Sequence, residues 1–270
     1  SSSARVPDNY DDAVTVTDAA TDSVTGSPGD DTRPISADSH IVAGPEVFEG
    51  LAERFGDDAP RVEHRPDKGD HIVIPSQPKR QVNVGFMALA ATRLDREVTL
   101  CRRPGHKPDT GSLSDPEIQA YLTGGYAAMR AGLTDGAKRS QDQDVDGIAA
   151  DVLYPGYFSM FSFPDVDLLV ALQRNYNDWL HAQCSASNGR LIGLAALPVQ
   201  DPEAAISELD RVLDLGYRGA VIASNAPKGR RYCDPEYDPL WARAQEAGVP
   251  ISFPVGCFSH TPSWLQETCG

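Results

Sequence analysis

Apolar runs alternate with amphipathic repeats along the second half of the chain. Four short runs have the continuous apolar character of strands buried on both faces, at 148–153, 191–197, 219–223 and 249–253. Between these runs, apolar residues recur at helical spacing in segments that start near Pro164, at Asp201-Pro202 and at Asp238-Pro239. This alternation of strand and helix predicts a parallel sheet with helices packed outside it.

Two arrangements of such a sheet are open, a doubly wound open sheet and a closed barrel. A doubly wound sheet that binds a dinucleotide carries a glycine-rich turn after its first strand. None of the predicted strands is followed by such a turn, and 148–153 is followed by Tyr154-Pro155-Gly156-Tyr157. The missing glycine loop weakens the nucleotide-binding interpretation and favours the barrel.

The first half of the chain is less regular. Residues 1–33 are rich in Ser, Thr, Asp, Gly and Pro, and we expect them to form a disordered acidic tail. A strand is predicted at 34–40. Residues 41–147 are interpreted as an insertion, with possible short strands at 71–74 and 82–86 and a helix at about 115–131.

Composition excludes some classes of partner. The 270 residues carry a formal net charge of −15, with no basic cluster, so phosphate backbones repel the chain and nucleic acid is not expected as a partner. The longest apolar runs are too short to cross a bilayer, so no membrane association is expected. The five scattered cysteines and the lack of a secretory signal predict a cytoplasmic protein.

Asp38 and His40 are the first candidates for chemistry. They lie two residues apart on a predicted strand, so both side chains point to the same face. They stand at the carboxyl end of that strand, where barrel enzymes have their sites. A carboxylate beside an imidazole provides half of a ligand set for Zn²⁺, Mn²⁺ or Fe²⁺. The alternative is a surface Asp and His at the end of a strand.

Further candidates follow two other predicted strands. Tyr154, Tyr157 and Phe158 would line the mouth of the barrel and stack on an unsaturated substrate, or else pack a loop onto the barrel. Ser224 and Asn225 end the strand at 219–223. They would form hydrogen bonds with a substrate, or else begin the next turn.

Five separated segments resemble the amidohydrolase-related family, which includes aminocarboxymuconate semialdehyde decarboxylase and the resorcylate-type decarboxylases. They are "PISADSHIVAGPEVFEGLAERFGDDAPRV", "DVDGIAADVLYPGYFSMF", "RNYNDWLHAQC", "GRLIGLAALPVQDPEAAISELDRVLDLGYRGAVIAS" and "YDPLWARAQEAGVPISFPVG". The resemblance implies a (β/α)₈ TIM barrel of the metal-dependent hydrolase type, with one divalent metal at its mouth. Family members break C–C bonds to a carboxylate, or hydrolyse C–N and C–O bonds.

The resemblance also implies a ligand set, which this sequence matches only in part. Asp38 and His40 match the acidic variant of the family's first-strand motif. Pro254 stands where the family has a ligand His in a context like "PISFHVG", and the chain reaches Gly270 before the family's final Asp. We therefore expect an incomplete barrel of about five strands over 34–256, followed by an irregular tail at 257–270. His260 would compensate for Pro254, or else belongs to that tail.

The sequence thus predicts a metal-dependent hydrolase or carboxy-lyase acting on a small carboxylated, possibly aromatic molecule. Zinc is the first metal expected, with manganese or iron as alternatives. A catalytically inactive barrel that serves as a scaffold or binding module is the second interpretation, which Pro254 favours. An incomplete barrel leaves sheet edges unpaired, so self-association into a homo-oligomer is also expected.

Overall fold

The computed structural model describes residues 33–78, 82–85, 116–156, 158–254 and 259 of the chain. The predicted acidic tail at 1–33 and the predicted irregular tail at 257–270 lie almost wholly outside these ranges. Both tails, and the boundaries of 34–256 drawn for the barrel, therefore stay predictions.

Parallel strands form two three-stranded sheets in the described ranges. One contains β1 (Ile35–Ile41), β5 (Ala150–Pro155) and β6 (Leu191–Gly193), and the other contains β7 (Ala195–Ala196), β8 (Ala220–Val221) and β9 (Ile251–Ser252). Only Leu194 separates β6 from β7. The N–H of Leu194 donates to Leu153 at 3.1 Å, and the N–H of Ala195 donates to Gly219 at 3.1 Å. The two sheets therefore continue into each other through one central strand.

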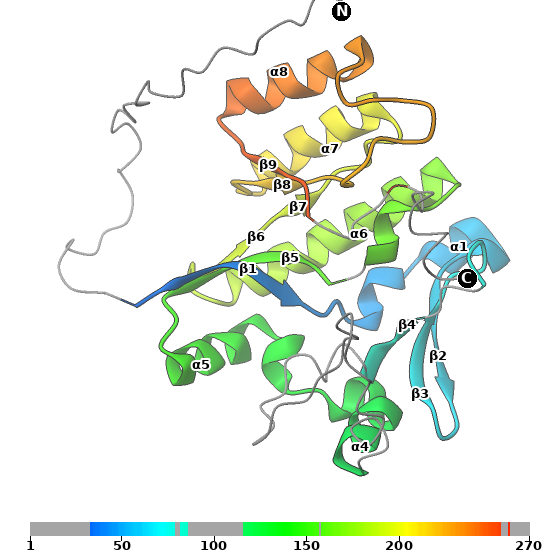
Figure 1. The fold of residues 1–270 in the computed structure, drawn as a ribbon, viewed down its shortest axis with the longest axis vertical. Helices are drawn as coiled ribbons and strands as arrows, with labels where there is room; N and C mark the ends of the chain where they lie inside the picture. Colours follow the sequence, from blue (N-terminus) through cyan, green and yellow to red (C-terminus); the bar gives the residue numbers. More distant parts are fainter. Residues whose placement is uncertain (1–32, 79–81, 86–115, 157, 255–258, 260–270) are drawn as a thin grey trace, which may run out of the picture. The chain divides into compact units, whose positions relative to one another are not determined.

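The strands follow one another across this succession in chain order: β1, β5, β6 with β7, β8 and β9 (Figure 1). The predicted parallel strands are confirmed in place. Neighbours in simple chain order are the arrangement of a β/α barrel, whereas a doubly wound sheet reverses its order. Among the described strands, β1 and β9 have one neighbour each, and the predicted incomplete barrel of about five strands stays a prediction.

Four helices connect the successive strands, namely α5 (Gly136–Asp146), α6 (Val166–Ser185), α7 (Pro202–Asp214) and α8 (Asp238–Ala247). Asp201 caps α7 as predicted, because its carboxylate accepts from the N–H groups of Glu203 at 3.0 Å and Ala204 at 3.1 Å. Two predicted helix starts are corrected. Helix α6 begins at Val166 with Asp165 as its cap, so Pro164 precedes the helix and does not lie in its first turn. Asp238 is the first residue of α8, with Tyr237 at the cap position.

The region between β1 and α5 contains a small antiparallel sheet in the order β2 (Arg61–Arg65), β3 (Gly69–Val73) and β4 (Val82–Asn83). The described residues of this region also contain short helices, namely η1 (Pro45–Phe48), α1 (Leu51–Phe55), η2 (Gly56–Asp58), α4 (Pro116–Gly124), η3 (Gly125–Ala128) and η4 (Ala131–Leu133). Two further turns of 3₁₀ helix lie elsewhere. The turn η5 (Phe158–Phe161) follows β5, and η6 (Pro235–Tyr237) directly precedes α8.

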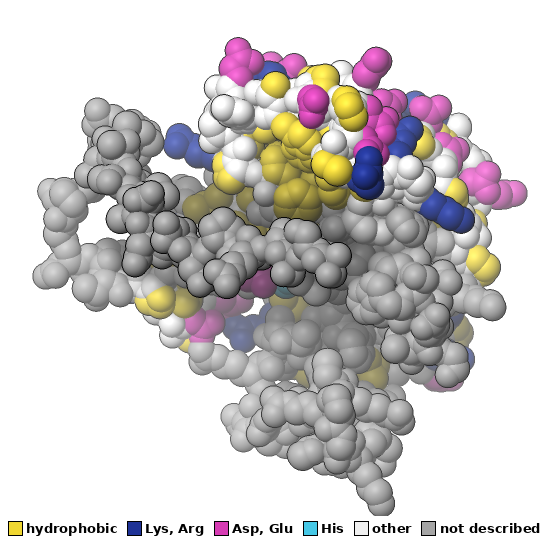
Figure 2. Space-filling model, turned by 45° about the horizontal axis from the view of Figure 1, so that its top comes forward, with side chains coloured by type: hydrophobic (Ala, Val, Ile, Leu, Met, Phe, Trp, Pro, Cys, Tyr) yellow, Lys and Arg dark blue, Asp and Glu magenta, His cyan; other side chains and the backbone are white. Residues whose placement is uncertain are grey.

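One large hydrophobic core packs α6, α7 and α8 against the parallel strands. Tyr176 and Leu180 of α6, Leu209 of α7 and Leu240 of α8 are fully buried in it. Some apolar side chains nevertheless face outward, and a patch of them lies between acidic side chains on the face drawn in Figure 2. Among the described residues, no helix has the length and apolar character needed to cross a membrane.

Candidate metal and substrate site

Asp38 and His40 lie close together on β1. Oδ1 of Asp38 is 3.7 Å from Nε2 of His40, and the two side chains are 80% and 47% exposed. Both therefore reach solvent at one face of the strand. His40 stands opposite Tyr154 of β5, and their ring centroids are 6.3 Å apart. The structure thus brings together three residues that the sequence singled out.

The Asp38–His40 pair fits two positions of a metal site. Two ligands bound at about 2.1 Å to one tetrahedral metal lie about 3.4 Å apart, which a small side-chain rotation provides from 3.7 Å. A third protein ligand is usual for a catalytic metal. The described residues contain no group of three or more His, Cys, Asp or Glu side chains that could hold a metal. The pair alone does not complete a catalytic metal site, and its role as metal ligands stays a prediction.

Tyr154 shows that the parallel strands curl. Its hydroxyl donates to Oγ of Ser252 on β9 at 3.2 Å. Three strand spacings separate β5 from β9, which in a flat sheet is about 14 Å, too far for this hydrogen bond. The strands therefore bend round so that the inward faces of β5 and β9 approach each other, as in a barrel. No local sequence pattern predicts this role of Ser252, because its partner Tyr154 lies far away along the chain.

Ser224 and Asn225 form hydrogen bonds with Pro254 and Ser259. Oγ of Ser224 donates to the backbone carbonyl of Pro254, and Oδ1 of Asn225 accepts from the N–H of Ser259 at 2.9 Å. Both side chains thus bond to protein groups, and their role toward a substrate stays a prediction. Pro254 contributes a backbone carbonyl acceptor. Its side chain has no atom that can bind a metal.

The remaining candidates are not placed by the structure. Tyr157 and His260 lie outside the described residues, and so does the side chain of Phe158. Cys184 of α6 is placed, and burial raises the pKa of its thiol to about 11. A thiol that stays protonated at neutral pH is a poor nucleophile and metal ligand. Cys184 therefore does not extend the candidate site.

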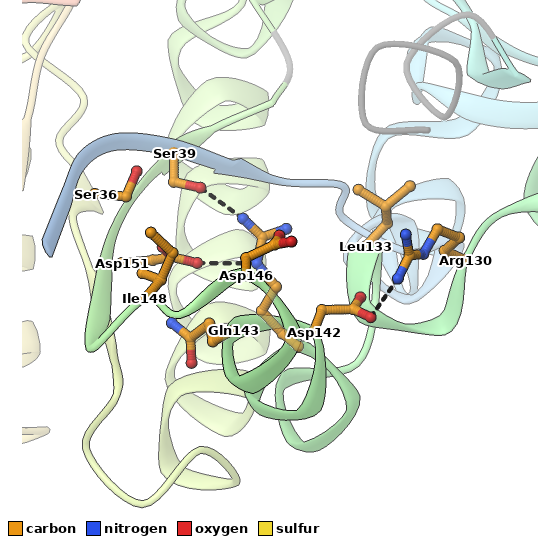
Figure 3. A pocket seen from close by; sticks show the side chains of 10 residues that line it. Ser36, Ser39, Arg130, Leu133, Asp142, Gln143, Asp146, Ile148 and Asp151 are labelled. Atoms are coloured by element: carbon orange, nitrogen blue, oxygen red, sulfur yellow. Dashed lines mark hydrogen bonds and ion pairs between the residues drawn. The ribbon is translucent and has the colours of Figure 1, made fainter. Parts of the chain in front are cut away.

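A second polar cluster, which the sequence reading missed, lies on the opposite face of β1. A cavity of about 290 Å³ there is lined by Ser36, Ser39, Arg130, Arg139, Asp142 and Asp151 among others (Figure 3). Arg139 of α5 donates from Nε to Asp151 at 2.9 Å and from Nη2 to Ser39 at 2.6 Å. These contacts join residues of α5, β5 and β1, so no local sequence pattern predicts them.

Comparisons with known proteins show what the chain is similar to. A family model described as Amidohydrolase matches residues 137–269. A gamma-resorcylate decarboxylase of Rhizobium radiobacter is 34% identical over 114 residues, which are 40% of this chain and 35% of that protein. The match thus spans about a third of the length of this curated relative.

Solved structures are also similar. An amidohydrolase from Mycobacterium avium subsp. paratuberculosis K-10 has a TM-score of 0.57 at 21% identity, over 82% of this chain and 57% of that one. It shows that the fold is shared. A dihydroxybenzoic acid decarboxylase from Polaromonas sp. JS666, solved with bound manganese and an inhibitor, has a TM-score of 0.43 at 27% identity, over 54% of this chain and 44% of that one.

Proposed function

We propose, from the premise that residues 137–269 form an amidohydrolase-family domain, that this chain belongs to a metal-dependent decarboxylase of small aromatic carboxylates. The observation that carries the proposal is the convergence of Asp38 and His40 beside Tyr154, at the carboxyl ends of chain-ordered parallel strands. Decarboxylation ranks ahead of hydrolysis because the gamma-resorcylate decarboxylase of Rhizobium radiobacter, one of the curated relatives that match, is named a decarboxylase.

The residues have distinct parts in this proposal. Asp38 and His40 hold the metal, and the remaining ligands are water or groups outside the described residues. A divalent metal, when bound, supplies positive charge that attracts a substrate carboxylate or phenolate. Tyr154 is half-buried, and Ser252 fixes its hydroxyl, so its ring offers a rigid wall beside His40 for an aromatic substrate. Zinc, manganese and iron all remain to be tested as the metal.

Metal content tests the proposal directly. The purified chain is analysed by plasma mass spectrometry beside Asp38→Ala and His40→Gln. His64→Gln is the matched control, because His64 forms a similar pair with Asp70, at 2.9 Å, in the antiparallel sheet. We expect near-stoichiometric metal in the wild type and His64→Gln, and background metal in the other two variants.

Turnover is then measured as CO₂ release from gamma-resorcylate in the metal-loaded chain. Release that falls to background in Asp38→Ala and His40→Gln, and persists in His64→Gln, supports the decarboxylase. Absence of both metal and CO₂ release in the wild type contradicts the decarboxylase.

A further inference from the structure

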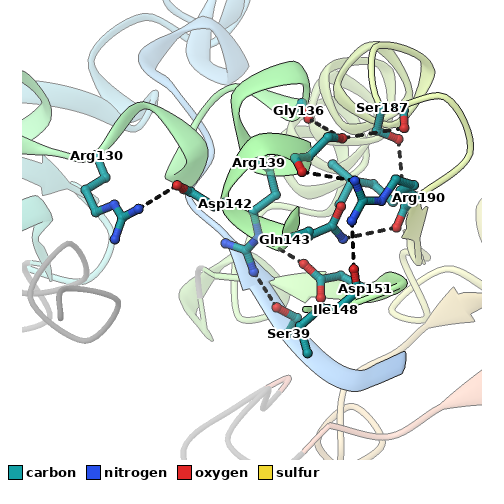
Figure 4. A network of polar contacts seen from close by, with 12 residues as sticks. Ser39, Arg130, Gly136, Arg139, Asp142, Gln143, Ile148, Asp151, Ser187 and Arg190 are labelled. Carbon is teal, nitrogen blue, oxygen red and sulfur yellow. Dashed lines mark hydrogen bonds and ion pairs between the residues drawn. The ribbon is translucent and has the colours of Figure 1, made fainter. Parts of the chain in front are cut away.

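The two predicted metal ligands flank Ser39, whose side chain forms a hydrogen bond on the other face of β1. Ser39 lies between Asp38 and His40 on β1, and its side chain points to the opposite face. There its hydroxyl accepts a hydrogen bond of 2.6 Å from Nη2 of Arg139, a residue of α5 (Figure 4). The same guanidinium donates from Nε to Asp151 of β5 at 2.9 Å. Arg139 therefore joins the ligand-bearing strand to its neighbour.

The strand is irregular at this place. β1 advances from Ser36 to Ser39 while β5 advances only from Asp151 to Leu153, so β1 carries one extra residue, as in a β-bulge. A bulge re-aims the side chains beside it, and it interrupts the backbone hydrogen bonds that would otherwise hold the strand. Asp38 lies within the irregular segment and His40 directly follows Ser39. The direction of both side chains thus depends on how firmly Ser39 is fixed.

Arg139 spans this irregularity. Asp151 stands opposite Ser36, before the extra residue, and Ser39 comes after it. The ion pair is well shielded, since the Asp151 side chain is 5% exposed and that of Arg139 is 17% exposed. A planar guanidinium offers two donors in fixed directions, which a lysine ammonium does not. The pair therefore resists fluctuations of the bulge.

We propose that Arg139, anchored by Asp151, is a positioning residue that sets the direction of Asp38 and His40 through Ser39. The consequence for metal binding rests on the proposed function, whereas the consequence for the order of His40 does not. The side-chain hydrogen bonds of Arg139 run to Ser39 and Asp151, so it acts on the predicted ligands through the strand.

Two pairs of variants isolate this role. Ser39→Ala removes only the hydroxyl that Arg139 holds, and Ser36→Ala is its control on the same face of β1 and in the same cavity. Arg139→Lys keeps the charge and loses the second donor. Arg130→Lys is its control, because Arg130 lines the same cavity and pairs with Asp142 instead. Ser39→Ala also keeps the test valid if Arg139→Lys does not fold.

Two measurements are made on the full chain. The first is the dissociation constant for Zn²⁺ and Mn²⁺, by competition with a chelating dye. We expect it to rise about 10- to 100-fold in Ser39→Ala and Arg139→Lys, the range found when groups behind a metal ligand are removed. The second is the NMR signal of the His40 imidazole Cε1–H without metal, assigned with His40→Gln. We expect a single sharp signal in the wild type and both controls, and a broadened or doubled one in the two test variants.

The two measurements separate the inference from the proposed function. If the wild-type chain binds no metal, the proposed function fails, and the His40 signal alone decides the role of Arg139. If Ser39→Ala and Arg139→Lys match their controls in that signal, the positioning role is overturned. Equal changes in Ser36→Ala or Arg130→Lys overturn it as well, because they show a general loosening of the cavity.

Discussion

Single residues differ in how well their contacts could be predicted from the sequence. The two-residue spacing of Asp38 and His40 on a strand is sufficient to predict that their side chains share a face. In the structure, Oδ1 of Asp38 lies 3.7 Å from Nε2 of His40. Ser252 and Arg139 were not predictable, because they meet Tyr154 and Ser39 only after the strands curl and α5 packs. Local spacing thus reveals neighbours on one element, whereas contacts between distant elements need the fold.

Cys184 provides a prediction at this scale. Burial raises the pKa of its thiol to about 11, well above the value of about 8.5 for an exposed thiol. The folded state therefore holds this proton more tightly than the unfolded state. The resulting stabilisation is complete below about pH 8.5 and is lost as the pH rises through about 11. Accordingly, we expect alkylation by iodoacetamide at pH 8.5 to spare Cys184.

Cys233 is the internal reference, since it is an exposed free cysteine of the same chain. Peptide mass spectrometry after brief alkylation should find Cys233 modified and Cys184 intact, with both modified after unfolding in guanidinium. Equal modification of the two thiols in the folded chain would show that Cys184 is accessible and its thiolate readily formed.

Elements were predicted best where their signals are local. The strands from 148 onward were found because strands buried on both faces read as continuous apolar runs. The start of α7 was found because its cap and first-turn proline are adjacent in sequence. The bulge in β1 was not predictable, since its cause lies in the register with β5. In the same way, the contact that joins α6 to the central strand has no sequence signature.

That contact is made by Asn177. Its amide accepts from the N–H of Ala196 at 2.8 Å and donates to the carbonyl of Ala196 at 3.0 Å, where β5 has already ended at Pro155. The side-chain amide thus makes the two backbone hydrogen bonds to Ala196 that a neighbouring strand would otherwise make. Asn177→Ala leaves both groups of Ala196 buried without this partner, and we expect a loss of about 2–5 kcal/mol in the free energy of unfolding.

Chemical denaturation measures this loss, with Asn175→Ala as the matched control. Asn175 lies on the same helix and donates to the carbonyls of Val47 and Glu49, but it is only half-buried, so water replaces it. We expect the control to lose less than about 1.5 kcal/mol. Equal losses in the two variants would mean that Asn177 does not substitute for a strand.

The whole molecule presents apolar groups near unpaired edges. Within the described residues, β1 and β9 each have a single neighbour, and Ile35 of β1 and Phe253 beyond β9 are 61% and 50% exposed. Strand edges with apolar side chains pair readily with other chains, and a lysine at such an edge opposes this pairing. We therefore expect the wild-type chain to associate as its concentration rises, and Ile35→Lys with Phe253→Lys to reduce that association.

Sedimentation velocity over a hundredfold range of concentration measures the effect. Val145→Lys is the control, because Val145 is 71% exposed but lies on helix α5 and not on a strand. If association is driven by the edges, the double variant sediments as a smaller species at concentrations where the wild type and Val145→Lys do not. A wild-type chain that remains a monomer at every concentration contradicts the prediction that the edges of β1 and β9 drive association. Such a result would mean that these edges are covered by something other than the described strands.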